Sequence, residues 1–362
     1  MKVAIVYDRV NKWGGAERLL LALHQIFPKA PLYTSVYNPE KATWARVFPK
    51  VIPSFLQKFP FAANHHEIYA PLMPIAFESF NFSGYELVIS VTSESAKGII
   101  TPPGTKHICI MLTPTRYLWS GYDEYFKNKF LKILSYPIVL YLKYWDKKAA
   151  SRPDKIIAIS KEVQKRIKKY YGIKSEVIYP PMFLSPKGKT IKGDKKIKTP
   201  VKSDYFLIVS RLVSYKRIDL AISAFNNLGI PLKIIGKGSE YWKLKLMAKD
   251  NIEFLGTLTD EELVKYYRKS IALVFPGKED FGLTILEAQS LGKPVIAFAA
   301  GGSKETVVDK KTGIFFYPQN SKKLEEAVRA FQRRKFNPEN ARKQASKFSF
   351  GNFKKEFLKT LN

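Results

Sequence analysis

Short apolar segments alternate with amphipathic segments along the whole chain. Helical periodicity of apolar positions is clearest from Ala16 to about Phe27, directly after the first apolar segment. Strands separated by helices indicate parallel sheets with right-handed crossover connections. The strands predicted in the first half are Val3–Tyr7, Leu87–Val91, Ile108–Leu112 and Ile156–Ile159.

The second half repeats this alternation. Its predicted strands and helices are, in chain order, Tyr205–Ser210, Ile218–Leu228, Leu232–Gly236, Tyr241–Asp250, Ile252–Leu255, Glu261–Lys269, Ala272–Phe275, Leu283–Leu291 and Val295–Phe298. The pattern predicts an α/β protein with two doubly wound, Rossmann-like parallel-sheet domains that face each other across a cleft. We place these domains at residues 1–175 and 176–345, with a C-terminal helix at residues 346–362 that returns to the first domain.

The composition limits which classes of protein and which kinds of binding site are possible. The chain has 362 residues, with 61 Lys and Arg against 31 Asp and Glu, so its formal net charge is +30. This charge indicates an anionic partner. The single cysteine, Cys109, excludes a disulfide framework, and four histidines leave little for a metal site. The start lacks the features of a signal peptide, and no apolar run reaches the about 18–20 residues that span a bilayer. We therefore expect a cytoplasmic protein.

Basic charge is concentrated in residues 126–174, which hold 14 basic and three acidic side chains. This segment includes the apolar and aromatic stretch Phe130–Trp145, in which Pro137 interrupts any single long helix. Buried rings beside clustered lysines are typical of a segment that lies on an anionic membrane. The alternative is a core helix followed by a solvated basic helix, Lys161–Tyr171. A second cluster of seven lysines, from Lys187 to Lys202, predicts an exposed loop.

Two motifs at predicted strand ends suit anions. Gly14-Gly15 lies between the first strand and the first helix, where backbone N–H groups at a helix start can approach a negative charge. Its spacing does not fit a dinucleotide-binding fingerprint. Arg211 and Lys216 follow the strand that opens the second half. Arginine can bind phosphate through two parallel hydrogen bonds and lysine adds a point charge, so this pair suits a diphosphate.

Two carboxylates follow the strand that ends at Phe275. Glu279 lies in the loop and Glu287 lies eight positions later, inside the next helix. Carboxylates accept hydrogen bonds from hydroxyl groups, so this pair suits a hydroxyl-rich ligand. We expect Asp280 or Thr284 to cap the helix. A further glycine-rich turn, Gly301-Gly302, follows the next strand along the chain.

Together these motifs resemble the retaining, two-domain (GT-B) glycosyltransferases of the group 4 type. The resemblance covers nearly the whole chain, and the segment EDFGLTILEAQSLGKPVIA around Glu279 and Glu287 is its most specific part. Thr113–Trp119 and Tyr179–Pro181 further resemble the bacterial surface-polysaccharide branch. Many members of that branch transfer mannose or other hexoses to lipid-linked acceptors, so the resemblance implies a hexosyltransferase that favours mannose.

The resemblance also implies roles for individual residues. Arg211 and Lys216 would hold the leaving diphosphate, and Glu279 would contact the donor sugar. Glu287 would bind the ribose. The full set of implied donor-binding residues is Gly14, Gly15, Gly236, Phe281, Gly282, Leu283, Thr284 and Glu287, and the candidates on the acceptor side are Glu17, Lys97 and Arg116. We expect no metal and no cofactor, because the two cations would replace a divalent ion and the nucleotide sugar is itself a substrate.

Two departures from the family pattern leave alternatives open. Leu112 and the segment Ser93-Glu94-Ser95 stand where relatives often carry histidines. A catalytically impaired, membrane-binding relative is therefore an alternative. A nucleotide-sugar epimerase, which shares the architecture, is another, and the charge alone suggests a nucleic-acid-binding protein. The expected partners are a GDP- or UDP-linked sugar, a lipid-linked glycan and the inner face of the cell membrane, with no nucleic acid.

Overall fold

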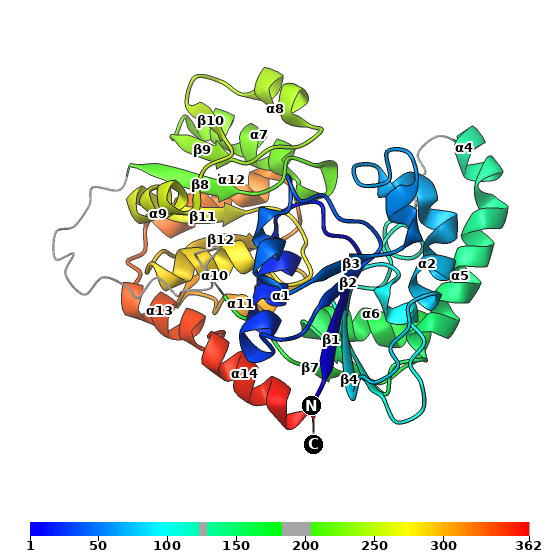
Figure 1. The fold of residues 1–362 in the computed structure, drawn as a ribbon. Coiled ribbons are helices and arrows are strands. Elements are labelled where there is room, and N and C mark those ends of the chain that lie inside the picture. Colours follow the sequence, from blue (N-terminus) through cyan, green and yellow to red (C-terminus); the bar gives the residue numbers. More distant parts are fainter. Residues whose placement is uncertain (123–128, 183–203, 362) are drawn as a thin grey trace. The chain divides into compact units, whose positions relative to one another are not determined.

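The computed structural model describes residues 1–122, 129–182 and 204–361 of the chain (Figure 1). The chain forms two compact units, Met1–Tyr179 and Pro180–Asn362. Each unit is built on one parallel sheet, so the predicted α/β class with two doubly wound, Rossmann-like domains is confirmed. That the two domains face each other across a cleft stays a prediction.

The first unit contains a seven-stranded sheet in the order β3-β2-β1-β4-β5-β6-β7. The central strands β1 and β4 are buried along their whole lengths, as expected for parallel strands covered on both faces. The strands are β1 (Val3–Tyr7), β2 (Leu32–Thr34), β3 (Val51–Pro53), β4 (Leu87–Thr92), β5 (Lys106–Met111), β6 (Lys155–Ala158) and β7 (Glu176–Val177).

The helices of the first unit vary in length from one to four turns. No helix in the described part of the chain is both long and apolar enough to cross a membrane. The helices are α1 (Gly15–Ile26), α2 (Met73–Glu78), α4 (Lys129–Leu134), α5 (Tyr136–Ala150) and α6 (Lys161–Tyr171), and the 3₁₀ helices are η1 (Thr43–Val47), η2 (Phe55–Lys58), η3 (His66–Leu72) and η4 (Ala96–Gly98). Pro137 lies in the first turn of α5, so the predicted interruption of a single long helix is confirmed.

The second unit contains a six-stranded sheet in the order β10-β9-β8-β11-β12-β13. Helices α7 and α12 pack on one face of this sheet, with α8 against α7, and α9 and α10 pack on the other, with α13 against α10 (Figure 1). The strands are β8 (Tyr205–Val209), β9 (Leu232–Ile235), β10 (Ile252–Gly256), β11 (Ser270–Phe275), β12 (Val295–Phe298) and β13 (Gly313–Phe316). The helices are η5 (Ser214–Lys216), α7 (Ile218–Leu228), α8 (Tyr241–Met247), α9 (Asp260–Lys269), α10 (Leu283–Ser290), α11 (Ser303–Thr306), α12 (Ser321–Gln332), α13 (Pro338–Ser346) and α14 (Phe350–Lys359).

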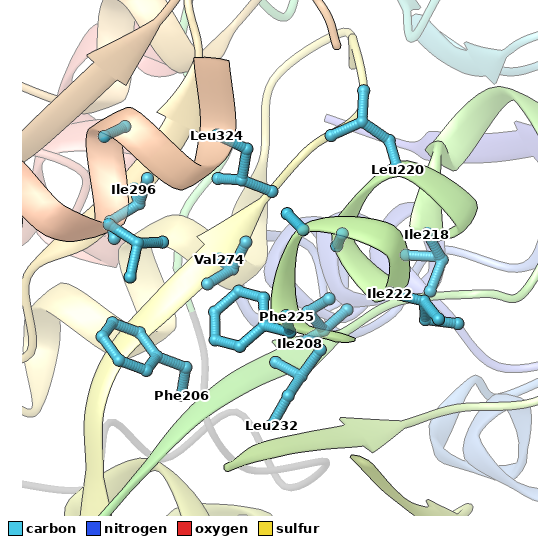
Figure 2. Close-up of a cluster of buried hydrophobic side chains, with 14 of the residues drawn as sticks. Phe206, Ile208, Ile218, Leu220, Ile222, Phe225, Leu232, Val274, Ile296 and Leu324 are labelled. Atoms are coloured by element: carbon cyan, nitrogen blue, oxygen red, sulfur yellow. The ribbon is translucent and has the colours of Figure 1, made fainter. Parts of the chain in front are cut away.

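The core of the second unit lies between α7, α12 and the sheet. Figure 2 shows Phe225 of α7 beside Ile208 of β8, with Val274 and Ile296 from the neighbouring strands on the same side. Leu324 of α12 closes the cluster. Phe206 and Phe225 pack edge to face, with ring centroids 5.3 Å apart. This packing fixes the sheet whose strand ends carry the predicted donor site.

Each sheet has one point at which the order of its strands reverses. In the first sheet the chain proceeds outward from β1 through β2 to β3 and then returns to place β4 on the other side of β1. In the second sheet it proceeds from β8 through β9 to β10 and returns to place β11 beside β8. Open α/β sheets bind ligands at such switch points, beyond the carboxyl ends of the strands. We therefore expect binding and catalytic residues in the loops after β1 and β4 and in those after β8 and β11.

Most predicted elements are confirmed to within a few residues, with four exceptions among the strands. Strands β2, β3, β7 and β13 were not predicted. Because β7 pairs with β6, the first unit extends to Tyr179 and the predicted boundary after residue 175 is too early. The predicted helix Tyr241–Asp250 ends at Met247, where the Asn226 side chain bonds the Met247 carbonyl and the Lys249 N–H.

Three predictions about segments have no structural outcome here. Residues 126–128 of the basic segment and the lysine cluster from 187 to 202 lie outside the described residues. The return of the C-terminal segment, residues 346–362, to the first domain stays a prediction, and contacts assign α14 to the second unit.

Candidate active site

The loop between β8 and α7 carries both predicted phosphate-binding cations. Arg211 is exposed, and its Nη2 donates to the Tyr215 hydroxyl at 2.5 Å. Lys216 ends η5, and only 9% of its side chain is exposed. The Leu212 N–H donates to the Lys237 carbonyl at 2.9 Å, which ties this loop to the one after β9. The backbone therefore holds both cations at the switch point of the second sheet.

Glu279 lies on the other side of this switch point, in the loop after β11. Its Oε1 forms an ion pair with Lys216 Nζ, and 23% of its side chain is exposed. Gly277 makes this approach possible, because a Cβ there would lie 2.8 Å from the Lys216 carbonyl oxygen. Two of the three predicted catalytic residues are thus in direct contact, although 63 positions separate them in the sequence.

The glycine pair Gly301-Gly302 supports the Glu279 loop from behind. The Gly302 N–H donates to the Glu279 carbonyl at 2.9 Å. Gly301 has a φ of +71°, and a Cβ there would lie 2.3 Å from the same carbonyl oxygen. A Cβ on Gly302 would lie 2.3 Å from Phe281 Cα. Larger side chains at these two positions would push the loop away, so the motif serves to place Glu279.

Helix α10 begins in a different way from the prediction. Its N-cap is Gly282, with a φ of +92° and no side-chain hydrogen bond, so the expected cap by Asp280 or Thr284 is wrong. The left-handed backbone at this position favours glycine, which carries no capping side chain. Leu283 and Thr284 form the first turn of the helix and are half-buried, whereas Phe281 is buried.

Glu287 points into the unit from the second turn of α10. It is 4% exposed, and its Oε2 accepts a hydrogen bond of 2.9 Å from the Tyr267 hydroxyl. Tyr267 lies on α9 and is fully buried. The orientation of the Glu287 carboxylate is thus set by a buried tyrosine that the sequence analysis did not select.

A pocket of about 370 Å³ lies at the carboxyl ends of β9 and β10. Its lining is formed by Gly236, Lys237, Gly238, Tyr241 and Gly256. Gly236 has a φ of +144°, and a Cβ there would lie 1.8 Å from a backbone carbonyl oxygen, so only glycine fits. The volume falls in the range of small-molecule sites, about 300–1,000 Å³. Gly236, which was predicted to bind the donor, thus lines this pocket.

The glycine loop of the first unit covers a buried carboxylate. Helix α1 begins at Gly15, and a Cβ on Gly14 would lie 3.1 Å from Glu17 Oε2. Glu17, a predicted acceptor candidate, is 2% exposed and accepts a hydrogen bond of 2.8 Å from the Tyr7 hydroxyl. Burial raises the pKa of Glu17. Its position under the loop gives it a supporting role in the first unit.

Asp8 organises the loop after β4, a role that was not predicted from the sequence. Its buried carboxylate accepts hydrogen bonds of 2.6 to 3.2 Å from the groups that follow this strand. The donors are the backbone N–H groups of Ser93, Glu94, Ser95 and Ala96 and the hydroxyls of Thr92 and Ser93. An acidic residue directly after the first strand was the signal available in the sequence.

Lys97, the second acceptor candidate, belongs to a buried network. Its Nζ lies 2.6 Å from Asp146 Oδ1, and both side chains are 1% exposed. The Asp146 carboxylate also accepts hydrogen bonds from Thr115 Oγ1, Trp119 Nε1 and Tyr171 Oη at 2.6 to 2.8 Å. The network joins η4, the loop after β5, α5 and α6. Lys97 thus has a structural role in the first unit.

The third acceptor candidate lies in the loop after β5. Arg116 is half-buried, and its carbonyl accepts a hydrogen bond of 2.8 Å from the Gly121 N–H, which closes a turn. Leu112 begins the same loop and is also half-buried. Arg116 therefore remains a candidate that faces partly outward at the carboxyl edge of the first sheet.

Comparison with known proteins assigns the second unit. Residues 190–348 match the model of the family described as glycosyl transferases group 1. This match lies within the second unit and covers less than half of the chain. The matched segment includes Arg211, Lys216, Gly236, Glu279 and Glu287, whereas the glycine loop of the first unit lies outside it.

Several known proteins resemble parts or all of this chain. An uncharacterized glycosyltransferase of Methanocaldococcus jannaschii is 29% identical over 226 residues, which are 58% of this chain and 59% of that protein. The O-antigen chain mannosyltransferase C of Escherichia coli is 29% identical over 136 residues, 35% of this chain and 37% of that protein. The chain thus spans less than two thirds of the length of these curated relatives.

A solved structure resembles the chain over its whole length. The Anabaena protein HepE in complex with UDP and glucose superposes with a TM-score of 0.71 at 18% identity, covering 100% of this chain and 99% of that one. The chain therefore has the GT-B fold, as the resemblance of the sequence motifs implied.

Proposed function

We propose that this chain is a retaining, metal-independent hexosyltransferase of the group 4 type. It moves a hexose, with mannose favoured, from a nucleoside-diphosphate sugar to a hydroxyl of a lipid-linked or polysaccharide acceptor. The observation that carries the proposal is the Lys216–Glu279 ion pair, with Arg211 in the same loop, at the switch point of a sheet that also bears a pocket at the ends of β9 and β10. The names of the relatives, a mannosyltransferase among them, support the same class.

The proposed mechanism follows from the charges at this switch point. The acceptor oxygen bonds to the anomeric carbon on the face from which the diphosphate leaves, and its proton passes to the leaving phosphate oxygen. Negative charge develops on that leaving oxygen as its bond to the anomeric carbon breaks. Arg211 and Lys216 neutralise that charge, which is the largest contribution that fixed groups can make in a site of this kind. Glu279 accepts hydrogen bonds from hydroxyls of the donor sugar, and the carboxylate of Glu287, oriented by Tyr267, accepts them from the ribose. The nucleobase occupies the pocket beside Tyr241.

Nucleotide binding tests this proposal directly. A ligand that binds only the folded state raises the melting temperature. We expect either GDP and GDP-mannose or UDP and UDP-glucose to stabilise the purified chain. In Arg211→Ala the stabilisation is expected to be smaller, because the diphosphate loses a charged hydrogen-bonding partner worth about 1.5–3 kcal/mol. A thermal-shift titration of both proteins measures the difference.

Arg329→Ala is the matched control for this experiment. Arg329 is an exposed arginine on α12, so its loss removes one positive charge without touching the loop after β8. We expect the shift in this variant to equal that of the parent protein. The absence of any shift with all four nucleotides at millimolar concentration would disprove the donor site.

A surface on the first unit supports an anionic membrane as partner. The outer side of α4 and α5, here called the aromatic face, carries large apolar side chains, each of which is between 44% and 75% exposed to solvent. Its members are Ile133, Leu134, Tyr136, Ile138, Leu140, Tyr141 and Tyr144. Lys147 and Lys148 follow on the same helix and are exposed. Apolar rings beside lysines suit a helix that lies in the headgroup region of an anionic bilayer, so we propose that the protein lies on the inner face of the cell membrane.

Vesicle binding tests the aromatic face. The chain is expected to sediment with vesicles of phosphatidylglycerol and to bind vesicles of phosphatidylcholine more weakly. Replacing Ile133 and Tyr144 together by serine should weaken binding to the anionic vesicles by about tenfold or more, since each buried apolar side chain contributes about 1.5–3 kcal/mol. The matched control replaces Trp242 and Leu246, which are 76% and 88% exposed on α8. Equal losses in both variants would contradict a specific membrane face.

A further inference from the structure

A second ion pair spans the switch point of the first sheet. Arg9 stands two residues after β1 and Glu94 stands two residues after β4, and Arg9 Nη1 pairs with Glu94 Oε1. The two side chains are 12% and 23% exposed. This is the position that Lys216 and Glu279 occupy in the second sheet. Each unit thus presents a cation and a carboxylate at the place where open α/β sheets bind ligands.

His66 approaches this pair from the start of η3. Its side chain is 4% exposed, and its Nδ1 lies 3.4 Å from Nδ2 of Asn11, which belongs to the same loop as Arg9. Nδ1 also lies 3.3 Å from Glu67 Oε2. Burial and the charge of Arg9 lower the pKa of His66 to about 4. The ring is therefore neutral at pH 7, with one nitrogen that donates and one that accepts.

Two buried nitrogens of this cluster have no hydrogen-bond partner within the described part of the chain. They are Arg9 Nε and His66 Nε2. Nearly all buried polar groups in folded proteins are hydrogen-bonded, so such pairs of unsatisfied groups are rare and point to a missing partner. Asn11, two residues after Arg9, contacts His66 Nδ1, which places the Arg9 and His66 side chains in one neighbourhood.

The charge balance of the cluster selects the kind of partner. Glu94 neutralises Arg9. In the second unit Arg211 adds a further cation beside the Lys216–Glu279 pair, which is the excess positive charge that a diphosphate needs. A sugar hydroxyl donates one hydrogen bond and accepts others, and it can therefore bridge an arginine, a carboxylate and a neutral imidazole. Four backbone N–H groups hold Asp8 and thereby fix the start of the loop that carries Glu94. The backbone position of Glu94 is thus fixed before a ligand binds.

We propose that Arg9, His66 and Glu94 bind hydroxyl groups of the acceptor sugar. This assignment rests on the proposed hexosyl transfer, and it adds to it a binding site in the first unit for a neutral, hydroxyl-rich ligand. His66 positions the acceptor through Nε2 and takes no part in bond breaking.

Nuclear magnetic resonance of the histidine rings tests the proposal on the full chain. The chain contains four histidines, so ¹⁵N-labelled histidine gives few ring signals, which single His→Gln variants assign. Methyl α-D-mannoside, methyl α-D-glucoside and methyl α-D-galactoside are added separately at high millimolar concentration. At least one is expected to shift the His66 Nε2 signal. His24 and His107 lie elsewhere in the unit and should not respond.

Two variants measure the contribution of the carboxylate. Glu94→Gln keeps the size of the side chain and removes its charge. We expect it to lower the affinity for the glycoside, measured from the titration of the His66 Nε2 signal, by about tenfold, the effect of losing one strong hydrogen bond. Glu40→Gln, at an exposed glutamate of the same unit, should leave the titration unchanged. Equal titrations in both variants would remove Glu94 from the site.

The outcomes separate this inference from the proposed transfer reaction. Nucleotide stabilisation without any shift of the His66 signal, for all three glycosides, would overturn the acceptor site and leave the donor site intact. A shifted His66 signal without nucleotide stabilisation would support a sugar site and disprove hexosyl transfer from a nucleotide. Shifts of all four histidines together would indicate a general solvent effect and would count against the site.

Discussion

Replacing Lys216 by alanine is expected to slow the release of nucleoside diphosphate from the bound sugar nucleotide by about 10²–10³-fold, the usual cost of removing one fixed group that stabilises developing negative charge. The loss has two causes. The leaving diphosphate loses a cation that the fold holds in place, with 9% of its side chain exposed. Glu279 also loses its ion-pair partner, and its unpaired charge then repels the diphosphate.

The measurement is the rate of UDP or GDP release from the sugar nucleotide that stabilises the protein, with water as the acceptor. Lys269→Ala is the matched control, because Lys269 is an exposed lysine at the end of α9. Lys216→Arg separates charge from shape, and we expect it to recover part of the rate. A Lys216→Ala rate within threefold of the parent rate, in a protein that still binds nucleotide, would contradict the proposed role.

The fold was largely predictable because parallel strands buried on both faces leave a strong signal. Continuous apolar runs such as Val3–Tyr7 and Val295–Phe298 were predicted with the observed bounds. The missed strands are short or lie at sheet edges. β2 and β3 have three residues each, and β7 has two, so none contains enough positions to show periodicity.

The candidate site was predictable where its residues lie close together in the sequence and form a recognisable motif. Glu279 lies in the loop before α10 and Glu287 lies in α10 itself, so their spacing of eight positions is visible as a local motif in the sequence. Contacts between distant segments gave no such signal. Asp8 bonds a loop about 85 positions away, and Tyr267 orients Glu287 from the preceding helix. Lys97 was selected for its charge, but its partner Asp146 lies on a helix 49 positions later, and burial changes its role.

Replacing Asp146 by alanine is expected to lower the free energy of unfolding of the first unit by about 3–5 kcal/mol, the cost of breaking a buried ion pair from one side. The Lys97 ammonium would remain 1% exposed without its carboxylate. Thr115, Trp119 and Tyr171 would each lose the acceptor of a hydrogen bond. These donors come from the loop after β5 and from α6, so the effect should spread beyond α5.

Urea unfolding followed by tryptophan fluorescence measures this change in the unit concerned, since four of the five tryptophans lie in it and Trp242→Phe removes the fifth. Lys147→Ala, at the exposed position next to Asp146, should change the midpoint little. The double variant Lys97→Met with Asp146→Leu leaves no buried charge, so we expect it to regain part of the stability that the single variant loses. Full recovery would mean that the three lost hydrogen bonds contribute nothing. A single variant as stable as the parent would show that Lys97 and Asp146 are not a buried pair in solution, because an unpaired ammonium in that place has to be destabilising.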